Sequence, residues 1–181
     1  LRISSGTMNV GTADGIRIML ANSATTLLQM EGGVLTVSGG INSATTTAAG
    51  TFTMSGGTMT LQTVDAGPQY TLLLGSATTL NWSGGTIIAV NGNAATDDID
   101  IRSTTQTITG GTLQIGSNTA TSTNQVSYIN GAGGQLNVWD LVIGGAGGAQ
   151  TISWRSSTNV LDDLTIQSGN TLQPASGFAI N

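Results

Sequence analysis

The densest group of charged side chains lies in one short polar stretch in the middle of the chain. Asp97, Asp98 and Asp100 are followed closely by Arg102. Carboxylate oxygens are the ligands that Ca²⁺ prefers, and the ion takes roughly six to eight of them. The alternative is a solvated loop leading into a strand, with Asp100 and Arg102 on one strand face. Because the glycine-rich nonapeptides of calcium β-rolls are absent, we favour the loop over calcium, and no other cofactor is indicated.

Two further groups could carry chemistry. Asp162 and Asp163 are adjacent, and neighbours on a strand point to opposite faces, so a paired acid–base site is not expected there. Trp154 and Arg155 could stack on the sugar rings of a glycan, as could Trp139. The same tryptophans could instead fill a widened turn or an end of the fold, and we favour this interpretation because buried aromatic rings dominate packing.

The composition excludes several classes of function. The 181 residues include no Cys and no His, the formal net charge is -5, and all four basic residues are arginines. Disulfides, thiolate metal sites, histidine acid–base catalysis and lysine Schiff bases are therefore excluded. The acidic balance argues against nucleic acid and anionic membranes as partners, and no apolar run is long enough to insert into a membrane. The arginines are dispersed along the chain: Arg2, Arg17, Arg102 and Arg155.

A short repeated motif is the strongest signal in the sequence. It reads apolar, Ser or Thr, Gly, Gly, Thr, apolar, any residue, apolar, and residues 54–61 are a clear copy. The repeats begin near residues 6, 33, 57, 85, 111 and 134, with a degenerate last copy over 159–181. A period between 20 and 50 residues is typical of solenoids and other repeat arrays. The glycines that we expect at tight corners are Gly6, Gly32, Gly33, Gly56, Gly57, Gly84, Gly85, Gly110, Gly111, Gly133 and Gly134.

Short segments between the glycines alternate apolar and polar residues and are rich in Thr, Ile and Val, which indicates strands. We therefore predict one all-β domain over residues 1–181. It is a parallel, right-handed β-helix of six to seven turns, with about 25 residues and three short strands per turn. Alternation predicts two inward columns of stacked side chains. The first column is Met8, Leu35, Met59, Ile87, Leu113 and Leu136, and the second is Val10, Val37, Leu61, Ala89, Ile115 and Val138.

The outward positions carry Thr, Asn and Gln, a composition that raises ice binding as an alternative function. Only Thr58 and Thr60 form a Thr-x-Thr pair in the motif strand. A regular threonine lattice is therefore not predicted, and hydrogen bonds along the stacked side chains are the expected role of these residues. Trp82 follows Met30 and Met54 at an inward position and is expected in the core.

The glycine-rich turns resemble those of secreted bacterial β-helix surface proteins, such as autotransporter passengers and filamentous-haemagglutinin-like adhesins. Residues 139–145 (Trp-Asp-Leu-Val-Ile-Gly-Gly) and 159–172, with Leu-Thr-Ile and Ser-Gly-Asn-Thr-Leu, carry the resemblance most clearly. The resemblance implies a secreted protein at the cell surface. β-Helix lyases and hydrolases of polysaccharides need grouped basic or acidic residues, and these are sparse here, so we do not expect an enzyme.

No amphipathic helix is predicted to cap either end of the stack. Uncapped strand edges are templates for pairing with another chain. We therefore expect an extracellular structural protein that associates end to end with other copies of itself as a filament, or forms the stalk of an adhesin. The alternatives are a carbohydrate-binding adhesin module that contacts glycans or cell surfaces, a polysaccharide-degrading enzyme, and a trimeric viral tail spike.

Overall fold

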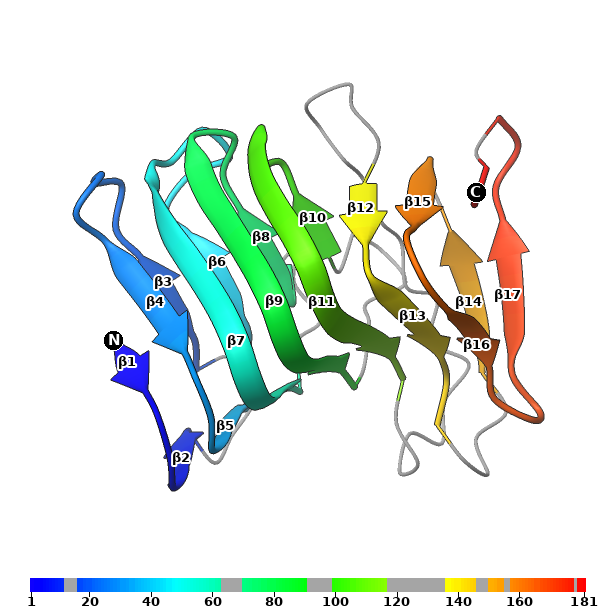
Figure 1. Cartoon of the computed structure of the whole chain (residues 1–181), viewed down its shortest axis with the longest axis horizontal. Coiled ribbons are helices and arrows are strands. Elements are labelled where there is room, and N and C mark those ends of the chain that lie inside the picture. The colour runs from blue at the N-terminus through cyan, green and yellow to red at the C-terminus, as the bar shows by residue number, and fades with distance from the viewer. Residues whose placement is uncertain are drawn as a thin grey trace.

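The computed structural model is an all-β parallel β-solenoid of about five turns, and its described residues contain no helix (Figure 1). The strands lie side by side along the long axis, with the N-terminus at one end and the C-terminus near the other (Figure 1). The sixth and seventh turns that the glycine spacing predicts stay a prediction. The structure describes residues 1–11, 16–62, 70–90, 99–116, 136–145, 150–154, 157–177 and 179–181.

One long sheet, the main sheet, runs through the molecule. Each strand pairs in parallel with a strand of the next turn, because each turn repeats the same alternation. Its strands in spatial order are β1 (Arg2–Ile3), β4 (Leu27–Met30), β7 (Gly50–Leu61), β9 (Thr78–Ala89), β11 (Thr105–Ile115), β13 (Asp140–Ile143) and β16 (Leu164–Ile166). Two short strands extend this sheet: β2 (Thr7–Val10) pairs with β5 (Val34–Val37), and β5 pairs with the second half of β7.

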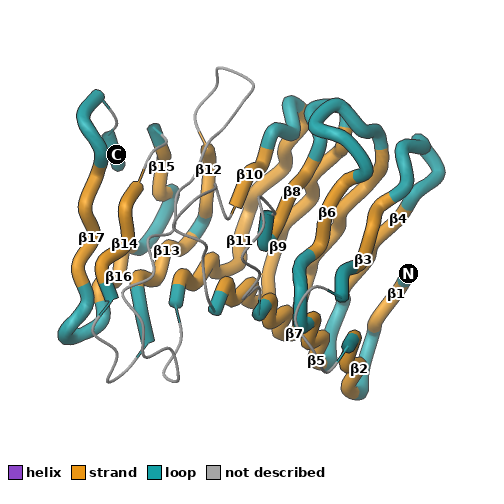
Figure 2. Tube along the Cα trace, turned by 180° about the vertical axis from the view of Figure 1, so that it is seen from behind, coloured by secondary structure: helices purple, strands orange, loops and turns teal. Residues whose placement is uncertain are grey.

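The remaining strands form three smaller sheets. The largest is visible from behind in Figure 2 and stacks β3 (Ile18–Leu20), β6 (Ile41–Ser43), β8 (Leu72–Leu74) and β10 (Ile99–Ile101). The other two join β12 (Leu136–Val138) to β15 (Thr158–Val160), and β14 (Thr151–Trp154) to β17 (Thr171–Pro174).

In β7, β9 and β11 the double glycines lie inside one long strand, whereas Gly6 and the pair Gly32 and Gly33 separate two short strands. In β7 the chain bends at Gly56 and Gly57 but continues as one strand, with the register shifting against β9 on both sides of Ser55. Gly57 has a φ of +81°, which side chains disfavour. Gly56 lies so close to the preceding turn that a Cβ atom would stand 2.6 Å from the Glu31 carbonyl oxygen. The second glycine of the pair is thus required by backbone conformation, and the first by the close stacking of one turn on the next. Gly133 and Gly134 lie outside the described residues.

From the second to the fifth copy of the motif the apolar columns occupy the core as the alternation predicts, whereas Met8 in the first copy is 37% exposed. Leu35, Met59, Ile87 and Leu113 pair in register from turn to turn and are almost fully buried. The next member is Leu141, which pairs with Leu113, and the second column likewise continues from Ile115 to Ile143.

Placing Leu136 and Val138 in these columns was wrong. They are buried, but they pair with Thr158 and Val160 in a separate sheet. The strand that begins at Asp140 has the same apolar alternation and pairs over four residues with β11. It therefore takes the place that the motif assigned to β12.

Trp82 lies in the interior as expected. It pairs with Met54, which pairs with Met30, and all three side chains are buried. The Trp82 Nε1–H group donates a hydrogen bond to the Gly84 carbonyl oxygen at 3.1 Å, so its one polar atom is satisfied inside the core.

Candidate functional site

The one described carboxylate of the predicted calcium stretch is part of a structural ion pair. Asp100 is fully buried, and Arg102 approaches its Oδ2 atom through Nε at 2.7 Å and through a terminal nitrogen at 2.6 Å. The hydrogen bond to Asp100 raises the pKa of Arg102. This arrangement agrees with the loop-and-strand interpretation and leaves Asp100 committed to Arg102 instead of solvent; Asp97 and Asp98 lie outside the described residues.

Trp154 is not a surface contact for sugars. Its side chain is fully buried, and Nε1 donates a hydrogen bond to the Thr158 hydroxyl oxygen at 2.9 Å. The ring fills the interior beside β17, as the packing interpretation expects. Trp139 is half-buried and donates from Nε1 to an Asp162 carboxylate oxygen at 3.1 Å. Arg155, the proposed companion of Trp154, lies outside the described residues.

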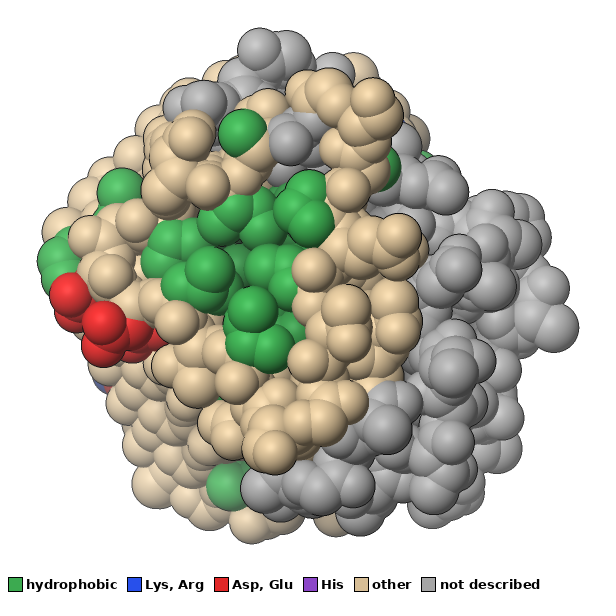
Figure 3. Space-filling view, turned by 90° about the vertical axis from the view of Figure 1, so that its right-hand side faces the viewer, with side chains coloured by type: hydrophobic (Ala, Val, Ile, Leu, Met, Phe, Trp, Pro, Cys, Tyr) green, Lys and Arg blue, Asp and Glu red, His purple; other side chains and the backbone are tan. Residues whose placement is uncertain are grey.

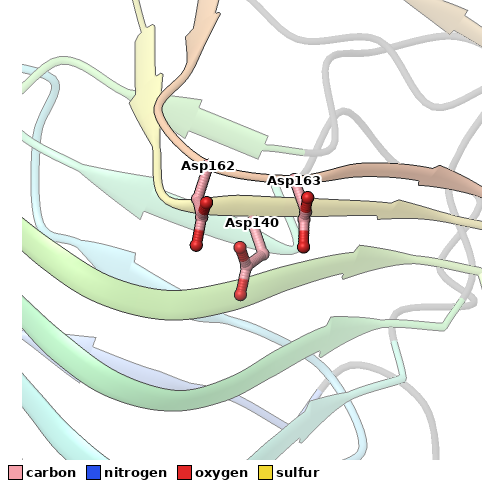
Figure 4. Close-up of side chains that lie close together, drawn as sticks. All are labelled: Asp140, Asp162 and Asp163. Atoms are coloured by element: carbon pink, nitrogen blue, oxygen red, sulfur yellow. The ribbon is translucent and has the colours of Figure 1, made fainter.

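Three carboxylates meet at one corner of the solenoid, which the sequence does not reveal. Asp162 and Asp163 come together because both lie before β16, in a turn where strand alternation does not apply. Asp140 joins them from β13, whose Leu141 amide donates to the Asp163 carbonyl oxygen. Each of the three residues offers an oxygen atom within 4.8 Å of the others, and Figure 4 shows the side chains gathered on one side of the ribbon.

This acidic cluster could attract a divalent cation but is not by itself a metal centre. It supplies three carboxylates, and Ca²⁺ needs roughly six to eight oxygen ligands. Neutral partners already use part of this capacity, because the Thr112 hydroxyl donates to Asp140 at 3.3 Å and Trp139 donates to Asp162. Two of the three carboxylates are exposed, and water accommodates such charges at little cost.

The outward face of the three long strands carries a more regular array than the sequence predicts. In the first halves of β7, β9 and β11, matched pairs of side chains stack in register and point outward. Among the described residues, none of these six side chains donates or accepts a hydrogen bond. The predicted hydrogen bonds along stacked side chains concern other positions, the outward residues between the two columns, and one is present there: Asn159 donates from Nδ2 to Asn137 Oδ1 at 3.0 Å. We call this surface the threonine face; it comprises Thr51, Thr53, Thr79, Asn81, Thr105 and Thr107.

The two ends of the solenoid expose side chains that the middle turns bury. At the N-terminal end, Met8 is 37% and Met19 is 58% exposed, whereas Leu35, the partner of Met8 in the next turn, is 0% exposed. At the C-terminal end, Leu164 is 44% and Ile166 is 48% exposed. Figure 3 views this end and shows an apolar patch surrounded mainly by uncharged surface, with acidic side chains at one edge.

The backbone edges at these ends are also open. Among the described residues, β2 pairs only with β5, and β16 pairs only with β13. Each therefore presents N–H and C=O groups along its outer edge, next to the exposed apolar side chains. We call the two surfaces the N-terminal end face (Met8, Val10 and Met19) and the C-terminal end face (Leu161, Leu164 and Ile166).

No family model matches the chain, and no curated protein or solved structure is significantly similar to it. Within the part of the chain that the structure describes, no helix has the length and apolar character needed to cross a membrane.

Proposed function

We propose that the chain is a non-enzymatic structural protein of the extracellular space or cell surface. It continues along its own axis, either as a subunit of a filament or as the stalk of a surface adhesin of the autotransporter or haemagglutinin type. We propose a right-handed coil, the usual hand of parallel crossovers, with three strands per turn and, from the motif spacing, six to seven turns. The observation that carries the proposal is that the apolar columns stay exposed at both ends.

Burial is the physical reason that the axis should continue. A solenoid turn buries its apolar residues only against the turns on either side, so an end turn is stable only when something covers it. Here three of the outermost members of the columns, Met8, Leu164 and Ile166, are 37%, 44% and 48% exposed, against 0% for Leu35, Met59 and Leu113 in the middle. Each fully buried aliphatic side chain contributes roughly 1.5–3 kcal/mol, which favours covering both end faces.

The described side chains give less support to an enzyme or to a glycan-binding module. Asp100 is occupied by Arg102, and Trp154 is buried away from any ligand. Asp162 and Asp163 have no basic side chain hydrogen-bonded to them among the described residues. A polysaccharide-degrading site needs positioned acids and bases, and a sugar platform needs exposed aromatic rings.

Sedimentation velocity of the purified chain over a wide concentration range tests the proposal. We expect the average particle mass to rise with concentration, because the end faces are apolar and edge groups are unpaired. If the chain stays a monomer at every concentration and does not add to an assembly on a cell surface, the filament form is rejected.

A second candidate function rests on the threonine face alone. Parallel pairing places its side chains about 4.8 Å apart between turns and roughly 6.6 Å apart within a strand. These side chains are uncharged, have no hydrogen-bond partner among the described residues and are held in register by parallel strands. Such an array can order a layer of water, which is the property that a protein needs to bind an ice surface.

Thermal hysteresis of dilute solutions tests this second candidate. The native chain should depress the freezing point below the melting point, and Thr79→Tyr, at the centre of the face, should remove the effect without changing the circular dichroism spectrum. Thr36→Tyr, outside the face, is the matched control. A native chain without hysteresis would reject ice binding.

A further inference from the structure

We infer that a second copy of this chain binds head to tail, with the C-terminal end face of one copy seated on the N-terminal end face of the next. In this contact β16 pairs in parallel with β2 of the neighbour, so that Leu164 lies beside Met8 and Ile166 beside Val10. The inference rests on the proposed function and specifies its partner, polarity and register.

The register follows from the columns within the molecule. Leu164 pairs with Leu141, and Ile166 pairs with Ile143. Leu164 and Ile166 therefore end the two columns that begin at Met8 and Val10. β2 and β16 therefore present the same alternation at opposite ends of the stack, with Asn9 and Thr165 as the outward residues between the apolar positions. A neighbour placed in this register continues both columns without a break.

The exposed side chains at both ends are apolar, so the two end faces can bury each other. Leu164 and Ile166 are almost half exposed, and Met8 is more than one-third exposed. Each of these side chains occupies a position that is 0% exposed in an internal turn, as Leu35 and Ile143 show. Stacking a second copy would bury them to the same extent and would pair both open strand edges.

Strand direction supports the head-to-tail polarity over contacts between like ends. Every strand pairing among the described residues is parallel. A head-to-tail contact continues this parallel pairing and both columns, whereas a contact between like ends that keeps the apolar sides inward would pair the edge strands antiparallel. Charge does not decide the polarity, because Arg2 at the first end is already paired with Glu31 at 2.7 Å. Heterologous contacts of this kind produce open filaments when the rotation does not close a ring.

Engineered cysteines test the register directly, because the native chain has none. In the double variant Asn9→Cys/Thr165→Cys, the two thiols lie on directly paired residues of neighbouring copies, and paired strands place Cα atoms within disulfide range. Oxidation should give a ladder of covalent multimers. The double variant Thr36→Cys/Thr165→Cys moves one thiol a full turn inward along the same outward column and should give no ladder.

The outcomes separate the inference from the proposed function. If multimers form but only the control variant or a different cysteine pair cross-links, the register is wrong and the filament proposal stands. If Thr165→Cys alone gives a covalent dimer, the contact is tail to tail and the polarity is wrong. If the wild-type chain binds only a different protein or does not associate at all, both the second copy and the filament form are rejected.

A charge placed on the end face gives a second measurement that does not depend on disulfide geometry. Ile166→Asp should lower the association constant roughly 30-fold or more, since an interface core does not tolerate an unpaired charge. Because Ile166 is already 48% exposed, the folded monomer should persist, as circular dichroism can verify. Ser55→Asp, at an exposed corner of β7, is the matched control and should associate like the native chain. Equal association of the two variants would overturn the inference.

Discussion

The double glycines allow backbone conformation and stacking to be tested separately with three single alanine substitutions. Gly6 has a φ of +77°, but a Cβ atom there would meet nothing within 4 Å. Gly56 has no positive φ, but its Cβ would stand 2.6 Å from the carbonyl oxygen of Glu31. Gly57 combines both features, with a φ of +81° and a Cβ 2.7 Å from the Gly33 carbonyl oxygen.

These differences set the expected loss of stability. An L-residue in the left-handed region costs about 1–2 kcal/mol. Forcing an extra methyl group into a packed interior costs about 1–3 kcal/mol. We therefore expect Gly6→Ala to lower the free energy of unfolding by about 1 kcal/mol, since its end turn is also the least buried. Gly56→Ala should cost about 1–3 kcal/mol, and Gly57→Ala about 2–5 kcal/mol, the sum of both effects.

Urea unfolding monitored by circular dichroism provides the measurement. The midpoint should fall in the order Gly6→Ala, Gly56→Ala, Gly57→Ala, and an unchanged slope would show that the variants unfold from the same compact state. Equal losses for Gly6→Ala and Gly57→Ala would mean that the turns are not stacked as closely as the 2.7 Å approach requires. A neutral Gly56→Ala would refute the stacking argument outright.

Further predictions concern the interior and the acidic corner. Arg102→Met should cost about 3 kcal/mol, because it leaves the buried Asp100 carboxylate without its cation. The raised pKa of Arg102 means that this stabilisation is present below its ordinary pKa and is lost only as the pH rises through the raised value, so urea midpoints should show the same loss at about pH 6 and about pH 9. A loss confined to one of these pH values would contradict the assignment. Trp154→Ala should lower the free energy of unfolding by about 3–5 kcal/mol, because it removes a fully buried ring. Added oligosaccharides should leave the fluorescence of native Trp154 unchanged. A change on adding oligosaccharide would mean that Trp154 contacts the ligand at the surface. Asp163→Asn should raise the urea midpoint at low salt by relieving repulsion from Asp140 and Asp162, and the gain should disappear in high salt; a gain that persists in high salt would have another cause.

The stacking of turns could be predicted because one pattern carries both its register and its faces. The glycine pair fixes where each turn bends, and the residues after it alternate in and out, so Leu35, Met59 and Ile87 could be aligned without a structure. The same pattern misleads at Leu136, which follows a glycine pair but is not the next member of the column. Only the pairing of Leu113 with Leu141 shows that β13, and not β12, continues the column.

The candidate sites are harder to predict from the sequence than the fold, because they depend on which residues of different turns lie side by side. The acidic corner requires knowing that Asp140 lies beside the turn that holds Asp162 and Asp163, which alternation along one strand cannot provide. The threonine face is not apparent from the repeated motif, because its members precede the double glycines and are brought together only by pairing between turns. The burial of Trp154 likewise depends on β17, a strand from the following turn.

Electron microscopy of the purified chain at high concentration shows whether copies stack end to end. We expect unbranched fibres one solenoid wide, with strands perpendicular to the fibre axis and a diffraction spacing of about 4.8 Å along that axis. Discrete particles one chain long, or side-by-side trimers, at every concentration would contradict end-to-end stacking.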